Sequence, residues 1–155
     1  MRYEKIQNDI IFKAQPLPVP FGCRISYKIT LLCIIVSINS HQTGCSLVKL
    51  QIINSILYRQ DIFRAIMNYF EINKLQSNFI IRYDPLINKA IEYALHDDLL
   101  MQLKNGKYKL THKGKIFVQN VLRENVLLEE IIRLKLLGDK LTEKIVQELL
   151  LECER

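Results

Sequence analysis

One dipeptide predicts a β-hairpin in a chain that otherwise has the composition of a helical protein. Asn105-Gly106 is the dipeptide preferred in a tight two-residue turn, and it lies between two short segments with apolar positions, Leu99–Lys104 and Lys107–Thr111. The chain as a whole has only five glycines and is rich in Leu, Ile, Glu and Lys, which favours helices. The sequence therefore predicts a mainly α-helical protein with a small β-hairpin.

Helical patterns surround this hairpin in the order of a winged-helix domain. Helices are predicted over 26–39, 46–58, 60–71, 85–97 and 111–122, and a short strand over 78–83. Ser26 and Ser46 are the expected N-caps of the first two helices, and Asp84 before Pro85 is expected to start the fourth. We therefore predict a winged helix-turn-helix core over residues 26–122, with the wing at about 99–111. The helix from Pro85 lies where a recognition helix belongs.

Two further segments flank this core. Residues 1–25 are predicted to form an N-terminal arm, in which Pro16, Pro18 and Pro20 alternate with apolar residues, a pattern that favours an extended segment. Such an arm packs either on its own domain or on a partner. Residues 123–155 predict a C-terminal helical hairpin, in which Gly138 ends the first helix and Thr142 caps the second.

The C-terminal hairpin carries more apolar residues than one helix face can hold. We expect it to bind another protein, and the alternative is that it packs onto the winged-helix core. The candidate interface residues are Leu127, Leu128, Ile131, Leu134, Leu149 and Leu150.

Basic residues are concentrated in and just after the predicted wing. The net charge is +6, and residues 101–120 contain five lysines and no acid. Such a cluster suits a phosphate backbone or an acidic protein surface. Non-specific contact to double-stranded DNA, contact to a protein and a solubilising role are all open. The candidate DNA contacts are Lys104, Lys107, Lys109, Lys113 and Lys115.

The predicted recognition helix is poorly suited to reading bases. It offers Asn88, Lys89 and Glu92, with Asp97 and Asp98 at its end. Acids on this face repel phosphates, so sequence-specific reading of the major groove is disfavoured.

No recognisable catalytic, cofactor-binding or metal-binding motif is present. The four cysteines include no C-x-x-C pair and indicate a reducing compartment. Cys45 lies at a predicted helix start, which favours a lowered thiol pKa, but no base partner can be assigned to it. His96-Asp97-Asp98 resembles part of a phosphohydrolase metal site without its other ligands. We expect no enzyme activity and no cofactor.

The sequence predicts a cytoplasmic protein. The N-terminus has no secretory signal pattern. The most apolar run, Leu31–Ile38, is eight residues long, far short of the roughly 20 residues of a membrane-spanning helix.

Four segments carry a resemblance to a known family. They are Ser46–Leu57, Tyr83–Ile91, Leu110–Lys115 and Leu137–Val146. Together they resemble the middle components of bacterial ABC-three-component systems, the small winged-helix subunits of Lamassu-type anti-phage defence complexes. The resemblance covers most of residues 20–150. Where the family often carries Trp-Ala after an Asn, this chain has Ser55-Ile56.

The resemblance implies a non-catalytic bridging subunit. It would lie near the heads of an SMC- or Rad50-like ATPase, hold an effector nuclease inactive and help to sense DNA. The expected partners are thus the ATPase, the effector and, through non-specific contact, double-stranded DNA. The alternative is a free-standing dimeric winged-helix transcription regulator, which predicts palindromic binding sites.

Overall fold

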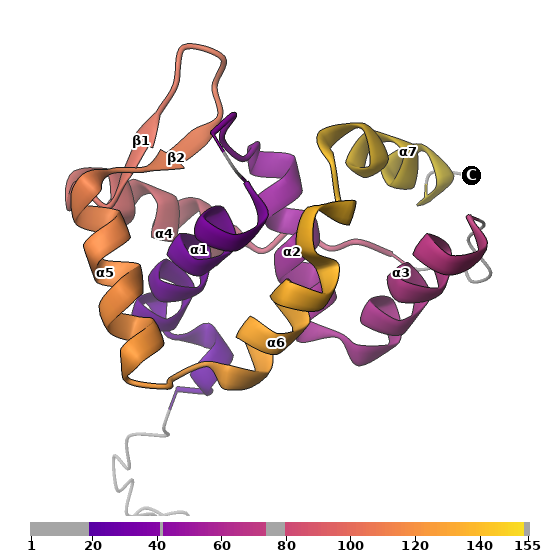
Figure 1. Ribbon diagram of the computed structural model, residues 1–155, viewed down its shortest axis with the longest axis horizontal. Coiled ribbons are helices and arrows are strands. Elements are labelled where there is room, and N and C mark those ends of the chain that lie inside the picture. The colour runs from indigo at the N-terminus through magenta and orange to yellow at the C-terminus, as the bar shows by residue number, and fades with distance from the viewer. Residues whose placement is uncertain (1–18, 41, 74–79, 154–155) are drawn as a thin grey trace, which may run out of the picture.

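A computed structural model describes residues 19–40, 42–73 and 80–153 of the chain. These residues form seven α-helices, two 3-10 helices and one two-stranded antiparallel sheet, so the protein is mainly helical with a small hairpin, as predicted (Figure 1). The helices are α1 (Ile25–Asn39), α2 (Leu47–Tyr58), α3 (Gln60–Ile72), α4 (Pro85–His96), α5 (His112–Arg123), α6 (Leu128–Leu137) and α7 (Glu143–Cys153). The strands are β1 (Leu100–Gln102) and β2 (Tyr108–Leu110), and the 3-10 helices are η1 (Phe21–Cys23) and η2 (Gly138–Lys140).

Helix α1 is the centre of the core. Its six consecutive residues from Leu31 to Val36 are all buried, because apolar side chains lie on every face of this helix. Helices α4, α5 and α6 pack around it, and the β1–β2 hairpin projects from one end of the molecule (Figure 1). Among the described residues, no helix combines the length and the apolar character needed to cross a bilayer.

The predicted helix starts are confirmed at three of four positions. The side chains of Ser46 and Asp84 accept hydrogen bonds from backbone N–H groups in the first turns of α2 and α4, and Thr142 Oγ1 accepts one from Ile145 N at 3.3 Å. Ser26 is not a cap. Helix α1 begins at Ile25, one residue before Ser26.

The strand predicted over 78–83 is wrong for residues 80–83, and residues 78–79 lie outside the described part. The segment before α4 is instead held by side chains of α2. Gln51 exchanges two hydrogen bonds with the backbone of Asp84, and Ser55 Oγ donates to Arg82 O at 3.0 Å. These side chains satisfy backbone groups that a neighbouring strand would otherwise have to satisfy.

The predicted hairpin is confirmed, but its turn has a different register. Gly106 N donates to Leu103 O at 2.9 Å, which makes Lys104 and Asn105 the central residues. Gly106 follows them with φ of +79°, as in three-residue hairpin loops that end in a left-handed glycine. The pairing is Leu100 with Leu110, Met101 with Lys109 and Gln102 with Tyr108.

A third segment extends this sheet by a single bridge. Cys45, in the loop between α1 and α2, pairs with Tyr108 through two backbone hydrogen bonds of 2.8 Å. The preceding Gly44 has φ of +81°, a conformation that favours glycine. The loop after α1 is thereby fixed to the inner strand of the hairpin.

The two flanking segments differ from their predictions in part. Residues 1–18 of the predicted arm lie outside the described residues, and Phe21–Cys23 form a 3-10 helix in place of an extended chain. The C-terminal segment is a pair of helices, α6 and α7, joined by η2. Leu134, Leu141 and Leu149 are fully buried. This segment therefore packs onto the core with one face.

Candidate nucleic-acid interface

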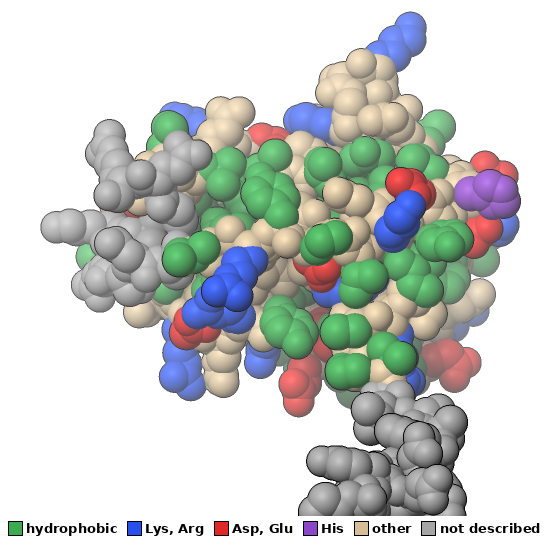
Figure 2. All heavy atoms as spheres, turned by 180° about the vertical axis from the view of Figure 1, so that it is seen from behind, with side chains coloured by type: hydrophobic (Ala, Val, Ile, Leu, Met, Phe, Trp, Pro, Cys, Tyr) green, Lys and Arg blue, Asp and Glu red, His purple; other side chains and the backbone are tan. Residues whose placement is uncertain are grey.

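The hairpin projects from the body of the protein and carries a basic side chain at its outer end (Figure 2). The five candidate lysines do not form one surface, however. Lys107 Nζ lies 3.9 Å from Glu143 Oε1 of α7, and Lys113 Nζ donates to Asp97 O at 2.8 Å, at the end of α4. Lys104 is exposed in the turn. Three of the five therefore face in different directions.

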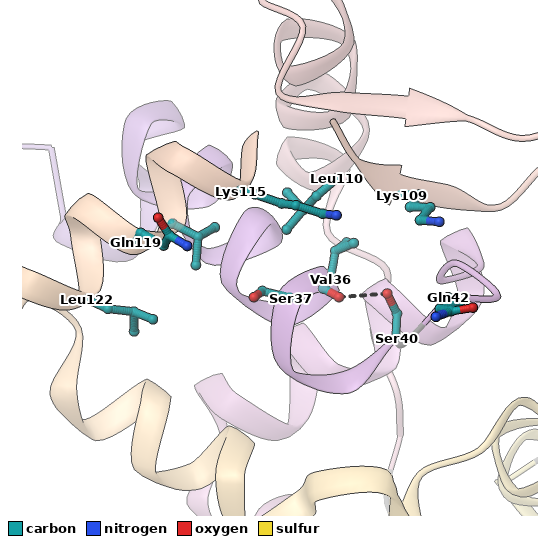
Figure 3. Close-up of a pocket in the computed structure, with 10 residues that line it drawn as sticks. Val36, Ser37, Ser40, Gln42, Lys109, Leu110, Lys115, Gln119 and Leu122 are labelled. Atoms are coloured by element: carbon teal, nitrogen blue, oxygen red, sulfur yellow. Dashed lines mark hydrogen bonds between the residues drawn. The ribbon is translucent and has the colours of Figure 1, made fainter. Parts of the chain in front are cut away.

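The other two lysines are brought together over one hollow. Lys109 of β2 and Lys115 of α5 extend over the same space beside the C-terminal half of α1 (Figure 3). The hollow has a volume of about 650 Å³. Within the described part of the chain, neither side chain makes a hydrogen bond or an ion pair. Their charges are thus available to a ligand.

The wall opposite the lysines is polar, and the floor is aliphatic. Ser37, Ser40 and Gln42 come from α1 and the loop that follows it, and Ser40 Oγ donates to Val36 O at 2.7 Å (Figure 3). The remaining lining residues are Val36, Leu110, Val118, Gln119 and Leu122. None of the ten lining residues is acidic or aromatic. The hollow therefore suits an anion that also carries apolar groups.

Helix α4 offers little for reading bases. On its exposed face, Lys89 Nζ lies 2.9 Å from Glu92 Oε2, so these two charges neutralise each other. Asn88 Oδ1 accepts a hydrogen bond of 3.4 Å from Gln51. Lys89 and the Asn88 carbonyl oxygen, which could read a base edge, are thus engaged within the protein.

The candidate protein-interface residues divide between the core and the surface, which corrects the expectation for three of them. Ile131, Leu134 and Leu149 are buried in this chain's own core, while Leu127 and Leu150 are half-buried. Only Leu128 is exposed among the six. The mixed positions arise because residues three or four apart share a helix face and adjacent ones do not.

The exposed apolar residues of α6 form a stripe that the prediction contained only in part. Leu128, Ile132 and Leu136 lie four residues apart and are 52%, 57% and 51% exposed. The i, i+4, i+8 spacing was present in the sequence, and it places the three on one side of a helix. Ile132 and Leu136 belong to this surface, which we call the α6 stripe.

A buried polar cluster joins α1, α2 and α4, and nothing in the sequence pattern pointed to it. Lys28 is 2% exposed, and its Nζ lies 2.8 Å from Asn54 Oδ1 and 2.7 Å from Asp84 Oδ2. The Tyr58 ring lies 5.7 Å from the same ammonium group. Burial alone would raise the pKa of Asp84, but the hydrogen bond from Lys28 and the Leu86 N–H outweigh it and lower that pKa.

The cysteine and histidine candidates gain no catalytic features. Burial raises the pKa of Cys45 to about 12, so the lowered pKa expected from its position at a helix start is wrong. His96 lies at the surface, with Nδ1 3.4 Å from Asp97 Oδ1. In the part of the chain that the structure describes, no group of three His, Cys, Asp or Glu residues could hold a metal ion.

Comparisons with known proteins identify no relative. No family model, curated protein or solved structure matches the chain.

Proposed function

We propose that this protein is a cytoplasmic, non-catalytic bridging subunit of an SMC- or Rad50-like ATPase complex in anti-phage defence, linking the ATPase heads to an effector nuclease. The observation that carries the proposal is the α6 stripe. The three aliphatic side chains of this stripe are each about half exposed and lie next to one another. A contiguous exposed apolar patch of this kind is typical of a protein-interaction site. The resemblance of the four sequence segments supplies the kind of partner.

A winged-helix core is part of the same proposal. The Cys45–Tyr108 bridge adds a third segment to the hairpin, and it comes between the first two helices of the core. This order, helix, bridge, helices and hairpin, favours a winged helix in which α3 is an additional helix. Helix α4 then takes the position of the recognition helix.

The partner proposal is tested by purification from the native host. The tagged chain is expected to co-purify with an SMC- or Rad50-like ATPase and an effector nuclease, identified by mass spectrometry. Ile132→Asp is expected to abolish this co-purification. Ile116→Asp is the matched control, because Ile116 is also an exposed isoleucine on a helix but lies on α5, outside the α6 stripe. Loss in both variants, or in neither, would contradict a role for the α6 stripe.

Non-specific contact to double-stranded DNA through the lysines of the hairpin and of the start of α5 is a second part of the proposal. Neutralising Lys104, Lys107, Lys109, Lys113 and Lys115 together is expected to weaken binding and to flatten its dependence on salt, because each lost phosphate contact lowers the salt slope by about one. Unchanged affinity and an unchanged salt slope would show that these lysines do not contact DNA.

The alternative function is a free-standing dimeric transcription regulator. The position of α4 before the hairpin favours it, and the internal Lys89–Glu92 pair on the exposed face of α4 disfavours it. A regulator would prefer one palindromic sequence by a large factor. Selection from a random DNA library distinguishes the two, since the bridging subunit is expected to enrich no sequence.

A further inference from the structure

The hollow beside β2 brings together two lysines whose charges are not compensated within the described chain. Several other cations lie next to a compensating oxygen: Lys107 next to Glu143, Lys113 next to the Asp97 carbonyl and Lys89 next to Glu92. Lys109 and Lys115 have no such neighbour among the described residues, and no acid lines the space between them. A ligand that brings negative charge would compensate both at once.

The floor of the hollow limits what kind of anion fits. Val36, Leu110 and Val118 are buried beneath it, and Leu122 is 39% exposed at its edge. A bare phosphate backbone would leave this aliphatic floor without a contact. Single-stranded nucleic acid is bound through aromatic side chains on which its bases stack, and no aromatic residue of the described part of the chain lines the hollow.

Several polar side chains of the hollow have unused hydrogen-bonding capacity. Ser40 Oγ is engaged with Val36 O. The side chains of Ser37, Gln42 and Gln119 make no hydrogen bond with any residue that the structure describes. A hydroxyl and two amides supply both donors and acceptors, which is what the main chain of an extended peptide requires.

We propose that this hollow binds an acidic peptide segment of a partner protein. An aliphatic side chain of the peptide contacts Val36, Leu110, Val118 and Leu122, and flanking carboxylates lie at Lys109 and Lys115. The amides and the Ser37 hydroxyl bind its backbone. The inference deepens the proposed function by naming the chemistry of one partner segment. It rests on the proposed function only for the identity of the partner protein that supplies the peptide.

The test uses the full chain and a fluorescein-labelled decapeptide in which one central leucine lies between glutamates and aspartates. Fluorescence anisotropy is expected to show saturable binding. The double variant K109E/K115E is expected to weaken binding by about tenfold, which is about 1.4 kcal/mol, because two attractions to carboxylates become repulsions. The matched control K104E/K113E changes the net charge equally but lies outside the hollow, and it is expected to weaken binding less than threefold.

Two further measurements make the proposal falsifiable. Replacing the central leucine of the peptide by serine is expected to weaken binding severalfold, because the aliphatic floor loses its contact. Equal weakening by K104E/K113E and K109E/K115E would overturn the proposal, since it would indicate attraction by net charge only. Displacement of the peptide by duplex DNA at equal charge, together with indifference to the leucine, would assign the hollow to nucleic acid instead. Neither result depends on whether an ATPase co-purifies, so failure of this inference and failure of the proposed function are distinguishable.

Discussion

Two lysine sites of this molecule, the junction of α1, α2 and α4 and the hollow beside β2, differ in how far their charges are compensated. At the junction of α1, α2 and α4, Lys28 is buried and touches both Asn54 and Asp84. At the hollow, Lys109 and Lys115 extend into open space without a described partner. A buried charge must be paired for the fold to be stable, whereas an uncompensated one over a hollow is available for binding. Burial and pairing thus separate structural lysines from candidate binding lysines.

The largest expected effect is at the junction. Lys28→Met keeps most of the side-chain volume but leaves Asp84 and Asn54 without their cation. We expect a loss of about 2–4 kcal/mol in the free energy of unfolding, below the full cost of an unpaired buried charge because Asp84 is partly exposed. Urea denaturation followed by circular dichroism measures it. A loss below about 0.5 kcal/mol, the size of an ordinary surface substitution, would contradict the structural role of Lys28.

The second effect concerns the contact between α5 and the hairpin. Gly114 of α5 lies so close to the hairpin that an added Cβ would be 2.0 Å from Leu99 O. Gly114→Ala is therefore expected to push α5 away from the hairpin and to cost about 1–3 kcal/mol, as overpacking does. Thermal denaturation provides the measurement. If the variant is as stable as the wild type, α5 and the hairpin are not in the close contact described.

The third effect is a dependence of stability on pH. The pKa of Asp84 is lowered in the folded state, so its contribution is present above the unfolded pKa of about 3.9 and is lost as pH falls through the folded value. We expect a decline in the free energy of unfolding below about pH 4 that is larger in the wild type than in Lys28→Met. Parallel curves for the two proteins would show that Lys28 does not lower this pKa.

The smallest effect is expected at the hollow. K109E/K115E removes an exposed and a half-buried cation that have no partner among the described residues, so the free energy of unfolding is expected to change by less than about 0.5 kcal/mol, as for surface substitutions in general. This is the opposite of the behaviour expected for Lys28. A loss of about 2 kcal/mol or more in the free energy of unfolding, measured by urea denaturation, would show that Lys109 and Lys115 stabilise the fold as Lys28 is expected to do. It would contradict the difference drawn between the two sites.

Local signals predicted most of the elements. Asp84 before Pro85, Ser46 and Thr142 are caps in the structure, because capping depends on a side chain and the next three backbone N–H groups. The hairpin was predictable from Asn105-Gly106 for the same reason. The type of turn was not predictable, because Asn105-Gly106 fits both a two-residue turn and a three-residue loop that begins at Lys104.

Long-range contacts could not be predicted from these patterns. Lys28 and Asp84 are 56 positions apart in the sequence, and Gln51 forms hydrogen bonds with Asp84, 33 positions away. No spacing rule connects such positions. The same holds for the hollow, where Lys109 and Lys115 meet α1. The lysine cluster was visible in the sequence, but only the packing of α5 against β2 and α1 decides which two of the five share a site.

The central claim is that this chain works by being bound to larger partners. Size-exclusion chromatography with light scattering, on tagged protein purified gently from its native host, tests it most directly. We predict a complex that contains an ATPase and is far heavier than the 18.3 kDa chain. For the Ile132→Asp variant we predict only the free chain. A stable monomer of 18.3 kDa as the sole species in the wild type would contradict the account.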